Sequence, residues 1–151
     1  MKPRPGSADH LANTHLPPGR RVDYRLAALA LVTVAVARVG LWLGRFPRTR
    51  AAVLRLVGRD ETGRMPDVAT ISLYVRRTAR LVPAASCLAQ AIACEALLRR
   101  YGYTCELSIG AGKDARGRFQ AHAWLVHDGR IVIGDFEDGM FETLATLKER
   151  T

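Results

Sequence analysis

Two strand-like runs joined by a two-residue turn are the feature that most constrains the fold of this sequence. Residues 119–127 and 130–135 are rich in the β-branched, aromatic and aliphatic side chains that favour strands. Between them stand Asp128 and Gly129, a pair that favours a type I′ turn because both residues tolerate positive φ. The pattern predicts an antiparallel hairpin near the carboxyl end of the chain.

The register of this hairpin decides which polar side chains can meet. With a two-residue turn, His127 faces Arg130, and counting outward along both strands places His122 opposite Asp135. Their Cβ atoms would then lie about 4.5–5.5 Å apart on one face of the sheet. Asp128 is much farther along the strand, roughly 20 Å from His122 at about 3.3 Å per residue. Asp135 is therefore the acid that we expect beside His122.

A cysteine stands at the start of an apolar helical run. Residues 87–101 have helical composition, with Ser86 as a natural N-cap and Gly102 as a left-handed stop. Cys87 would be the first residue of this helix, where free N–H groups and the helix dipole favour a thiolate and can stabilise an oxyanion. The helix is apolar on almost every side, which predicts that it is buried.

Cys87, His122 and Asp135 together fit a thiol nucleophile, its base, and the acid that orients the base. Each residue also has a simpler interpretation. The cysteine fits a small buried hydrophobe, the histidine a structural hydrogen-bonding group, and the aspartate a solvated strand end. The residues alone leave both interpretations open.

Composition indicates one modest globular domain, since the 151 residues are 48% hydrophobic and 25% charged. The three cysteines include no C-x-x-C pair, so they predict neither a disulfide framework nor a metal site. Cys87 and Cys94 would be about 10.5 Å apart on one helix, too far for a disulfide. Cys105 alternates with apolar residues and fits the core. We expect a reducing, cytoplasmic environment and no cofactor.

Positive charge is concentrated in the first half of the chain. Residues 1–82 hold 15 Lys+Arg and 5 Asp+Glu, a net charge of +10, whereas residues 83–151 hold 8 and 9, a net charge of −1. A basic half of this kind suits an acidic peptide, a partner protein or anionic lipid. Nucleic acid is the least expected partner, because no nucleic-acid-binding motif is present.

The first half also contains the most apolar segment, at residues 24–44. Its uninterrupted apolar run, residues 26–37, is shorter than the ~20 residues that cross a bilayer, and Arg38 follows it. We therefore expect a buried or interfacial helix there, and contact with a membrane surface stays open. We expect residues 46–50 to end this helix. The other expected elements are helices at 51–57 and 68–81, a strand at 103–109, a loop at 110–118, and a short helix within 137–151.

Helices followed by one helix packed on an antiparallel sheet give an α+β fold. Four segments carry a family resemblance: Ser86-Cys87-Leu-Ala-Gln90-Ala, Leu97-Leu-Arg-Arg-Tyr-Gly102, Leu107-Ser-Ile-Gly110 and Phe119-Gln-Ala-His122-Ala-Trp124-Leu. They resemble the leader peptidase of lasso-peptide biosynthesis, a transglutaminase-like, papain-related cysteine peptidase. The resemblance is close over residues 68–136.

This resemblance implies Cys87 as nucleophile, His122 as general base and acid, and Asp135 as the orienting acid. It also marks Gln90 and Trp124 as candidate substrate-binding residues. The implied substrate is a precursor peptide whose leader is removed before a lasso cyclase closes a macrolactam, with a separate leader-recognition protein delivering it.

On this basis we expect a disordered leader (1–22), a basic helical segment for partner docking (23–65) and a transglutaminase-like peptidase domain (66–151). Two alternatives share these residues. One is a transglutaminase-like acyl transferase with the same acyl-enzyme, and the other is a non-catalytic peptide-binding module in which Cys87 belongs to the core.

Overall fold

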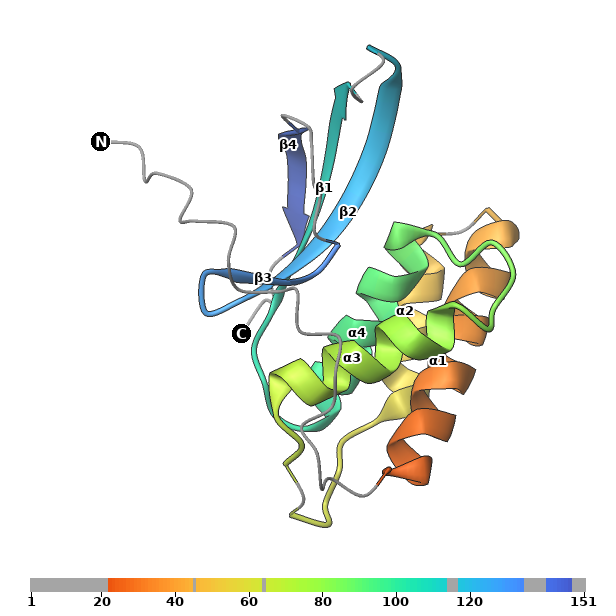
Figure 1. Cartoon of the computed structure of the whole chain (residues 1–151), viewed down its shortest axis with the longest axis vertical. Helices are drawn as coiled ribbons and strands as arrows, with labels where there is room; N and C mark the ends of the chain where they lie inside the picture. The colour runs from red at the N-terminus through yellow and green to blue at the C-terminus, as the bar shows by residue number, and fades with distance from the viewer. Residues whose placement is uncertain (1–21, 45, 64, 114–116, 135–140, 148–151) are drawn as a thin grey trace.

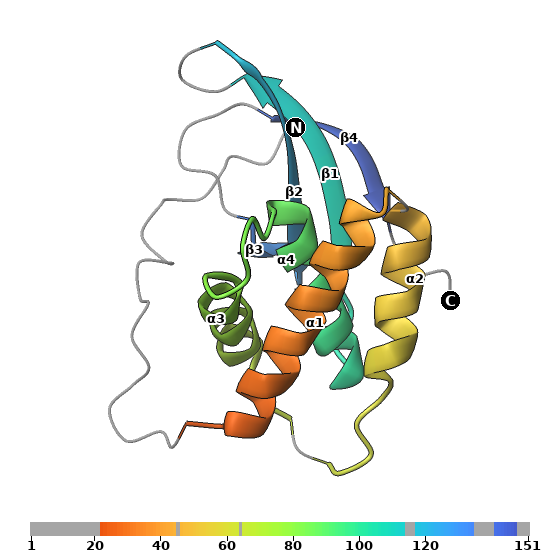
Figure 2. The same cartoon turned by 90° about the vertical axis from the view of Figure 1, so that its right-hand side faces the viewer.

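Four helices precede a four-stranded sheet in a computed structural model that describes residues 22–44, 46–63, 65–113, 117–134 and 141–147. The elements are α1 (Tyr24–Trp42), α2 (Phe46–Val57), α3 (Val68–Ala79), α4 (Cys87–Arg100), β1 (Glu106–Lys113), β2 (Phe119–His127), β3 (Arg130–Ile133) and β4 (Phe141–Leu147). The helices gather on one side of the sheet, with α3 and α4 nearest to it and α1 and α2 outside them (Figures 1 and 2). The α+β prediction, with a cysteine-bearing helix packed on an antiparallel sheet, is confirmed.

Three of the helices begin at the polar caps that local chemistry favours. The side chain of Asp23 accepts hydrogen bonds from the backbone of Arg25 and Leu26 at the start of α1. Asp67 caps α3 in the same way, and Ser86 caps α4. Each cap satisfies N–H groups that lack an intrahelical partner.

Helix α2 begins earlier than predicted. The sequence indicated a break over residues 46–50, but α2 starts at Phe46 and places Pro47 in its first turn. Proline is tolerated there because the first N–H groups of a helix have no intrahelical acceptor. Close packing holds this turn against α1, since a Cβ on Gly40 would lie 2.5 Å from Cγ2 of Thr49.

The sheet has the strand order β3-β2-β1-β4 and is antiparallel throughout. Strand β1 continues to Lys113, so the predicted loop is shorter, because β2 pairs with β1 from Val126 back to Phe119. The helix expected within the tail is wrong: residues 141–147 form β4 on the second edge of β1. Pairing with that edge outweighs local preference.

The predicted hairpin forms, but its register shifts. Asp128 and Gly129 have φ of 46° and 73°, as the type I′ turn requires, and His127 faces Arg130. Beyond the pair Val126–Ile131, however, Leu125 pairs with Ile133, which leaves one extra residue on β3. This β-bulge makes the assumption of an unbroken ladder wrong. Asp135, whose pairing with His122 rested on that ladder, lies outside the described residues.

One hydrophobic cluster joins all four helices to the sheet. Helix α4 lies at its centre and is buried from Ala91 to Leu98, as predicted. Helices α1 and α2 contribute Leu26, Val34 and Val53, each no more than 2% exposed. Helices α1 and α2 therefore share one core with α3, α4 and the sheet. Helix α1 is also long and apolar enough, by length and composition alone, to cross a membrane.

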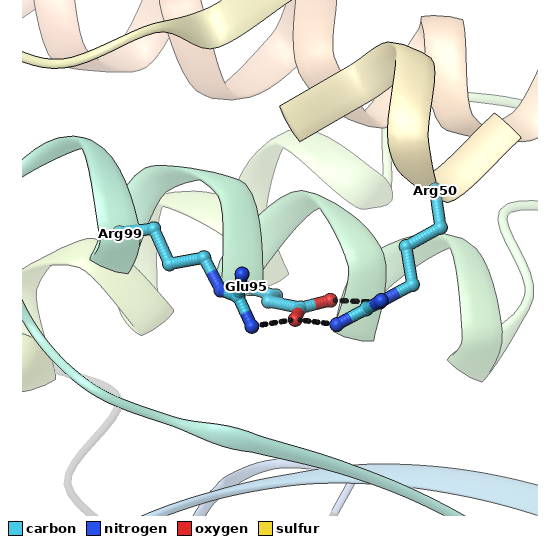
Figure 3. Close-up of polar contacts among 3 residues, drawn as sticks. All are labelled: Arg50, Glu95 and Arg99. Atoms are coloured by element: carbon cyan, nitrogen blue, oxygen red, sulfur yellow. Dashed lines mark hydrogen bonds and ion pairs between the residues drawn. The ribbon is translucent and has the colours of Figure 1, made fainter. Parts of the chain in front are cut away.

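A buried carboxylate ties α2 to α4 (Figure 3). Glu95, fully buried on α4, accepts from Nε of Arg50 over 2.8 Å and also from Nη2 of the same guanidinium. Nη2 of Arg99, one turn farther along α4, lies 2.9 Å from the same carboxylate. The two-point contact of Arg50 gives this helix pair a defined orientation.

Candidate active site

The thiol of Cys87 lies at the first residue of α4 and is partly exposed. The Ser86 hydroxyl accepts from the backbone N–H of Ala89 over 3.3 Å. One turn into the helix, the Gln90 side-chain amide donates to the carbonyl of Ala85 over 3.4 Å. These contacts hold the segment that leads into α4, so the position of Cys87 is defined from both sides.

The turn before Ser86 contains a strained residue. Ala84 has φ of 54°, in the left-handed region that residues with a Cβ adopt at a cost of about 1–2 kcal/mol. Strain of this kind is frequent beside functional sites. Nothing in the sequence indicated it, because alanine has no preference for this conformation.

Exposure distinguishes Cys87 from the other two thiols. Cys94 is fully buried and Cys105 is 6% exposed. Burial raises the pKa of the Cys94 thiol, and neighbouring Cys105 raises it further. A buried thiol that resists ionisation is a poor nucleophile. Cys87 is therefore the cysteine best placed for thiol chemistry.

His122 stands on β2 where the strand passes from exposed to buried. Residues 119–121 are exposed, residues 123–125 are buried, and His122 between them is partly exposed. Its Nε2 lies 2.8 Å from the backbone carbonyl of Gly134. A carbonyl oxygen can only accept, so Nε2 carries the proton of this hydrogen bond. In the neutral ring, Nδ1 is then the basic nitrogen.

Two neighbours hold the His122 ring. Trp124, 7% exposed, lies along it with ring centroids 6.4 Å apart and an interplanar angle of 20°. Gly134, with φ of 82°, comes so close to β2 that a Cβ on it would lie 2.3 Å from the carbonyl oxygen of Ala123. Only glycine fits there. We did not predict Gly134 from the sequence, although a glycine within a strand-like run is a signal of close backbone approach.

The two predicted catalytic side chains lie on elements that pack together, α4 and β2. Alternation along β2 sends His122 and Trp124 to one face and Ala123 and Leu125 to the other, and the latter two join the core with α4. Among the residues that the structure describes, no hydrogen bond joins the Cys87 thiol to His122. The catalytic roles assigned to Cys87, His122 and Asp135 stay predictions, as do the substrate-binding roles of Gln90 and Trp124.

The second histidine of β2 has a different environment. The Nδ1 atom of His127 lies 2.6 Å from the carbonyl of Thr104, and its ring meets that of Tyr103 edge to face. Its Nε2 lies 3.4 Å from the Asp128 carboxylate. These contacts connect the hairpin to the segment before β1, so the role of His127 is structural.

A partly exposed thiol at the first residue of a buried helix that packs on an antiparallel sheet defines an α+β domain with a cysteine where thiol chemistry is favoured. The chain belongs to the transglutaminase-like superfamily, whose profile matches residues 30–146. The match begins inside α1 and ends in β4, so it includes the helices on both sides of residue 65. Comparisons with curated proteins and with solved structures returned no match.

Proposed function

We propose that this protein is a cytoplasmic cysteine peptidase that removes the leader from a ribosomally made lasso-peptide precursor. The observation that carries the proposal is the place of Cys87, a partly exposed thiol at the first residue of buried helix α4 in a transglutaminase-like domain. The resemblance of the segments around Cys87 and His122 to lasso leader peptidases supports the substrate.

In the proposed reaction, Nδ1 of His122 takes the thiol proton of Cys87, and the sulfur attacks the carbonyl carbon of the bond to be cleaved. Backbone N–H groups at the start of α4 stabilise the resulting oxyanion. The protonated His122 then gives its proton to the departing amine, and a thioester remains on Cys87. His122 next activates water, which hydrolyses the thioester and frees the thiol.

This sequence of steps requires Cys87 and His122 to come within hydrogen-bond distance. Alternation along β2 turns His122 away from the residues that pack on α4, so the start of β2 must shift or twist against α4 for the ring to reach the thiol. The exposed start of β2, residues 119–121, leads directly to His122 and is open to an extended peptide. Substrate binding along these strand residues is the step that we expect to complete the site.

A separate leader-recognition protein delivers the precursor in this proposal, and the lasso cyclase acts on the released core. The docking role predicted for residues 23–65 cannot be tested by deletion, because α1 and α2 supply part of the core. Full-length variants of the exposed arginines on α2, Arg48 and Arg55, provide the test instead. Partner-stimulated cleavage that weakens in these variants would support docking.

The deciding experiment mixes the purified chain with a synthetic precursor peptide and the leader-recognition protein, without cyclase, and follows the products by mass spectrometry. Hydrolysis releases two fragments whose summed mass exceeds the precursor by one water. An added primary amine separates the alternatives, since an acyl transferase would join it to the new carboxyl end. A peptide-binding module would leave the precursor intact even with Cys87 fully reduced.

A further inference from the structure

The outer face of α1 is apolar along most of its length. Val32 and Val39 are 54% and 57% exposed, and their seven-residue spacing places them on the same side of the helix, two turns apart. Trp42 at the end of α1 is 74% exposed, and Leu43 after it is 63% exposed. Helix α1 therefore presents one apolar side to the core and another to the surroundings, which is unusual for a solvated surface.

Helices α1 and α2 are basic and contain no acidic side chain. From Tyr24 to Val57, across α1 and α2, the sequence has six arginines and neither aspartate nor glutamate. Arg25, Arg48 and Arg55 are exposed, and Leu56, which follows Arg55 on α2, is 64% exposed. The two helices lie next to each other, on the side of the molecule away from the sheet (Figure 2). Such a surface attracts an anionic partner.

Polar groups are too few on this face for an ordinary protein interface. Protein–protein interfaces have about one hydrogen bond per 100–200 Å² of buried surface. The one threonine of α1, Thr33, is 1% exposed and donates inward to the carbonyl of Leu29 over 2.6 Å. Apart from Thr33, Arg25 and Arg38, the polar side-chain atoms of this helix are those of its terminal aromatic residues. Contact with hydrocarbon, unlike a protein interface, does not require hydrogen-bonding groups on this face.

Aromatic side chains stand at both ends of the apolar face. Tyr24 is 79% exposed and Trp42 is 74% exposed, and along the helix they are about 27 Å apart. Tyrosine and tryptophan favour the boundary between lipid headgroups and hydrocarbon, because their rings are apolar with one polar tip. Their positions suit a helix that lies flat in that boundary.

We propose that the outer face of α1, with the adjoining exposed side chains of α2, docks this protein on an anionic lipid surface. Helix α1 lies in the plane of the interface and does not cross the bilayer. Crossing would remove Ala30, Val34 and Ala37, all 0% exposed, from the core that they share with α3 and α4. The arginines contact lipid phosphates, and Val32, Val39 and Trp42 enter the headgroup–acyl boundary.

Co-sedimentation of the full-length protein with vesicles tests the proposal without reference to any peptidase activity. Vesicles of equal parts phosphatidylglycerol and phosphatidylcholine should pellet the wild-type protein, and vesicles of phosphatidylcholine alone should pellet much less. The double variant Val32→Glu/Val39→Glu should lose at least about tenfold in apparent affinity, because it places two carboxylates in the interface. Leu144→Glu, at a 68% exposed leucine on β4, is the matched control and should bind as wild type does.

Arg48→Gln and Arg55→Gln test the charge contribution separately from the apolar one. Each should weaken binding to the anionic vesicles roughly fivefold at low salt, and added salt should weaken wild-type binding in the same way. Circular dichroism of every variant should match that of the wild type, since all five substituted positions are exposed.

The proposal is overturned if the wild type stays in the supernatant with both kinds of vesicle, or if the double glutamate variant pellets as the wild type does. Two other occupants would also overturn it. A vesicle-free dimer that Val32→Glu/Val39→Glu converts to monomer would assign the face to a second copy of the chain. Capture of the wild type, but not of this variant, by the purified leader-recognition protein, without vesicle binding, would assign it to that protein.

Discussion

The Nε2 atom of His122 donates a hydrogen bond to the backbone carbonyl of Gly134 over 2.8 Å. This contact makes Nδ1 the basic nitrogen of the neutral ring and fixes how the ring is turned. A backbone carbonyl thus supplies part of the orienting function that a carboxylate supplies in a catalytic triad. The bulge on β3 shifts the register of this part of the hairpin by one residue, and Gly134 comes one residue after the end of β3.

We expect Gly134→Ala to damage both stability and activity. The added Cβ would lie 2.3 Å from the carbonyl of Ala123 and 2.8 Å from Cα of Trp124, so the backbone must move and the bond to His122 must stretch. Gly102→Ala is the matched control, because its φ of 83° is equally left-handed while nothing lies within 4 Å. Thermal unfolding should show a loss of about 1–2 kcal/mol for the control and clearly more for Gly134→Ala. Equal losses would mean that the close approach is unimportant.

His122→Ala should reduce precursor cleavage by at least about a hundredfold, since general acid–base catalysis contributes 10²–10⁴. Asp135→Asn should retain more activity than His122→Ala, because the Gly134 carbonyl still holds the Nε2 proton. His127→Ala is the control and should keep its cleavage rate, as its ring contacts Thr104 and Tyr103. Steady-state kcat/KM for the three variants checks this order, and an inactive His127→Ala beside an active His122→Ala would reverse the assignment.

Cys87 should be the first cysteine to react when the native protein is treated with iodoacetamide. Cys94 is fully buried, Cys105 is 6% exposed, and only Cys87 combines partial exposure with a helix start. Peptide mass mapping over time should show Cys87 modified while the other two stay free until denaturant is added. Cys87→Ala should fold normally and release no leader, whereas modification that begins at Cys94 would contradict the burial on which the assignment rests.

The raised pKa of Cys94 predicts a loss of stability at alkaline pH. In the unfolded chain this thiol ionises near its ordinary pKa of about 9, whereas the folded protein keeps it protonated to higher pH. The unfolded state therefore releases a proton that the native state retains, and the free energy of unfolding falls as pH rises above about 9. The expected slope is about 1.4 kcal/mol per pH unit. Urea unfolding of the wild type and of Cys94→Ala across this range should show that slope in the wild type and a shallower one in the variant.

Arg50→Ala should destabilise the protein by about 3 kcal/mol, near the lower end for breaking a buried ion pair, because Arg99 still contacts Glu95. Arg48→Ala on the same helix is exposed and should cost less than about 0.5 kcal/mol. Denaturant midpoints for the two variants provide the comparison. If both changed stability alike, the buried carboxylate would not depend on α2.

Features governed by neighbouring residues were predictable from the sequence. Ser86 as the cap of α4, the buried character of that helix and the type I′ turn at Asp128 and Gly129 depend on local hydrogen bonding, side-chain polarity and backbone freedom. The same local signals placed Cys87 at a helix start and His122 on a strand. Those two residues carry the functional proposal, so its chemistry was open to inference before the fold was known.

Tertiary structure decided what depends on pairing between distant segments. The bulge opposite Leu125 and Val126 and the strand at residues 141–147 follow from edges that β2 and β1 offer, and a one-residue slip changes every later pairing. Helix α2 starts at Phe46 because it packs against α1 and α4, and α1 and α2 contribute to the core for the same reason. The Gly134 carbonyl beside His122 is a backbone group, which every residue carries, so only the folded chain could reveal it.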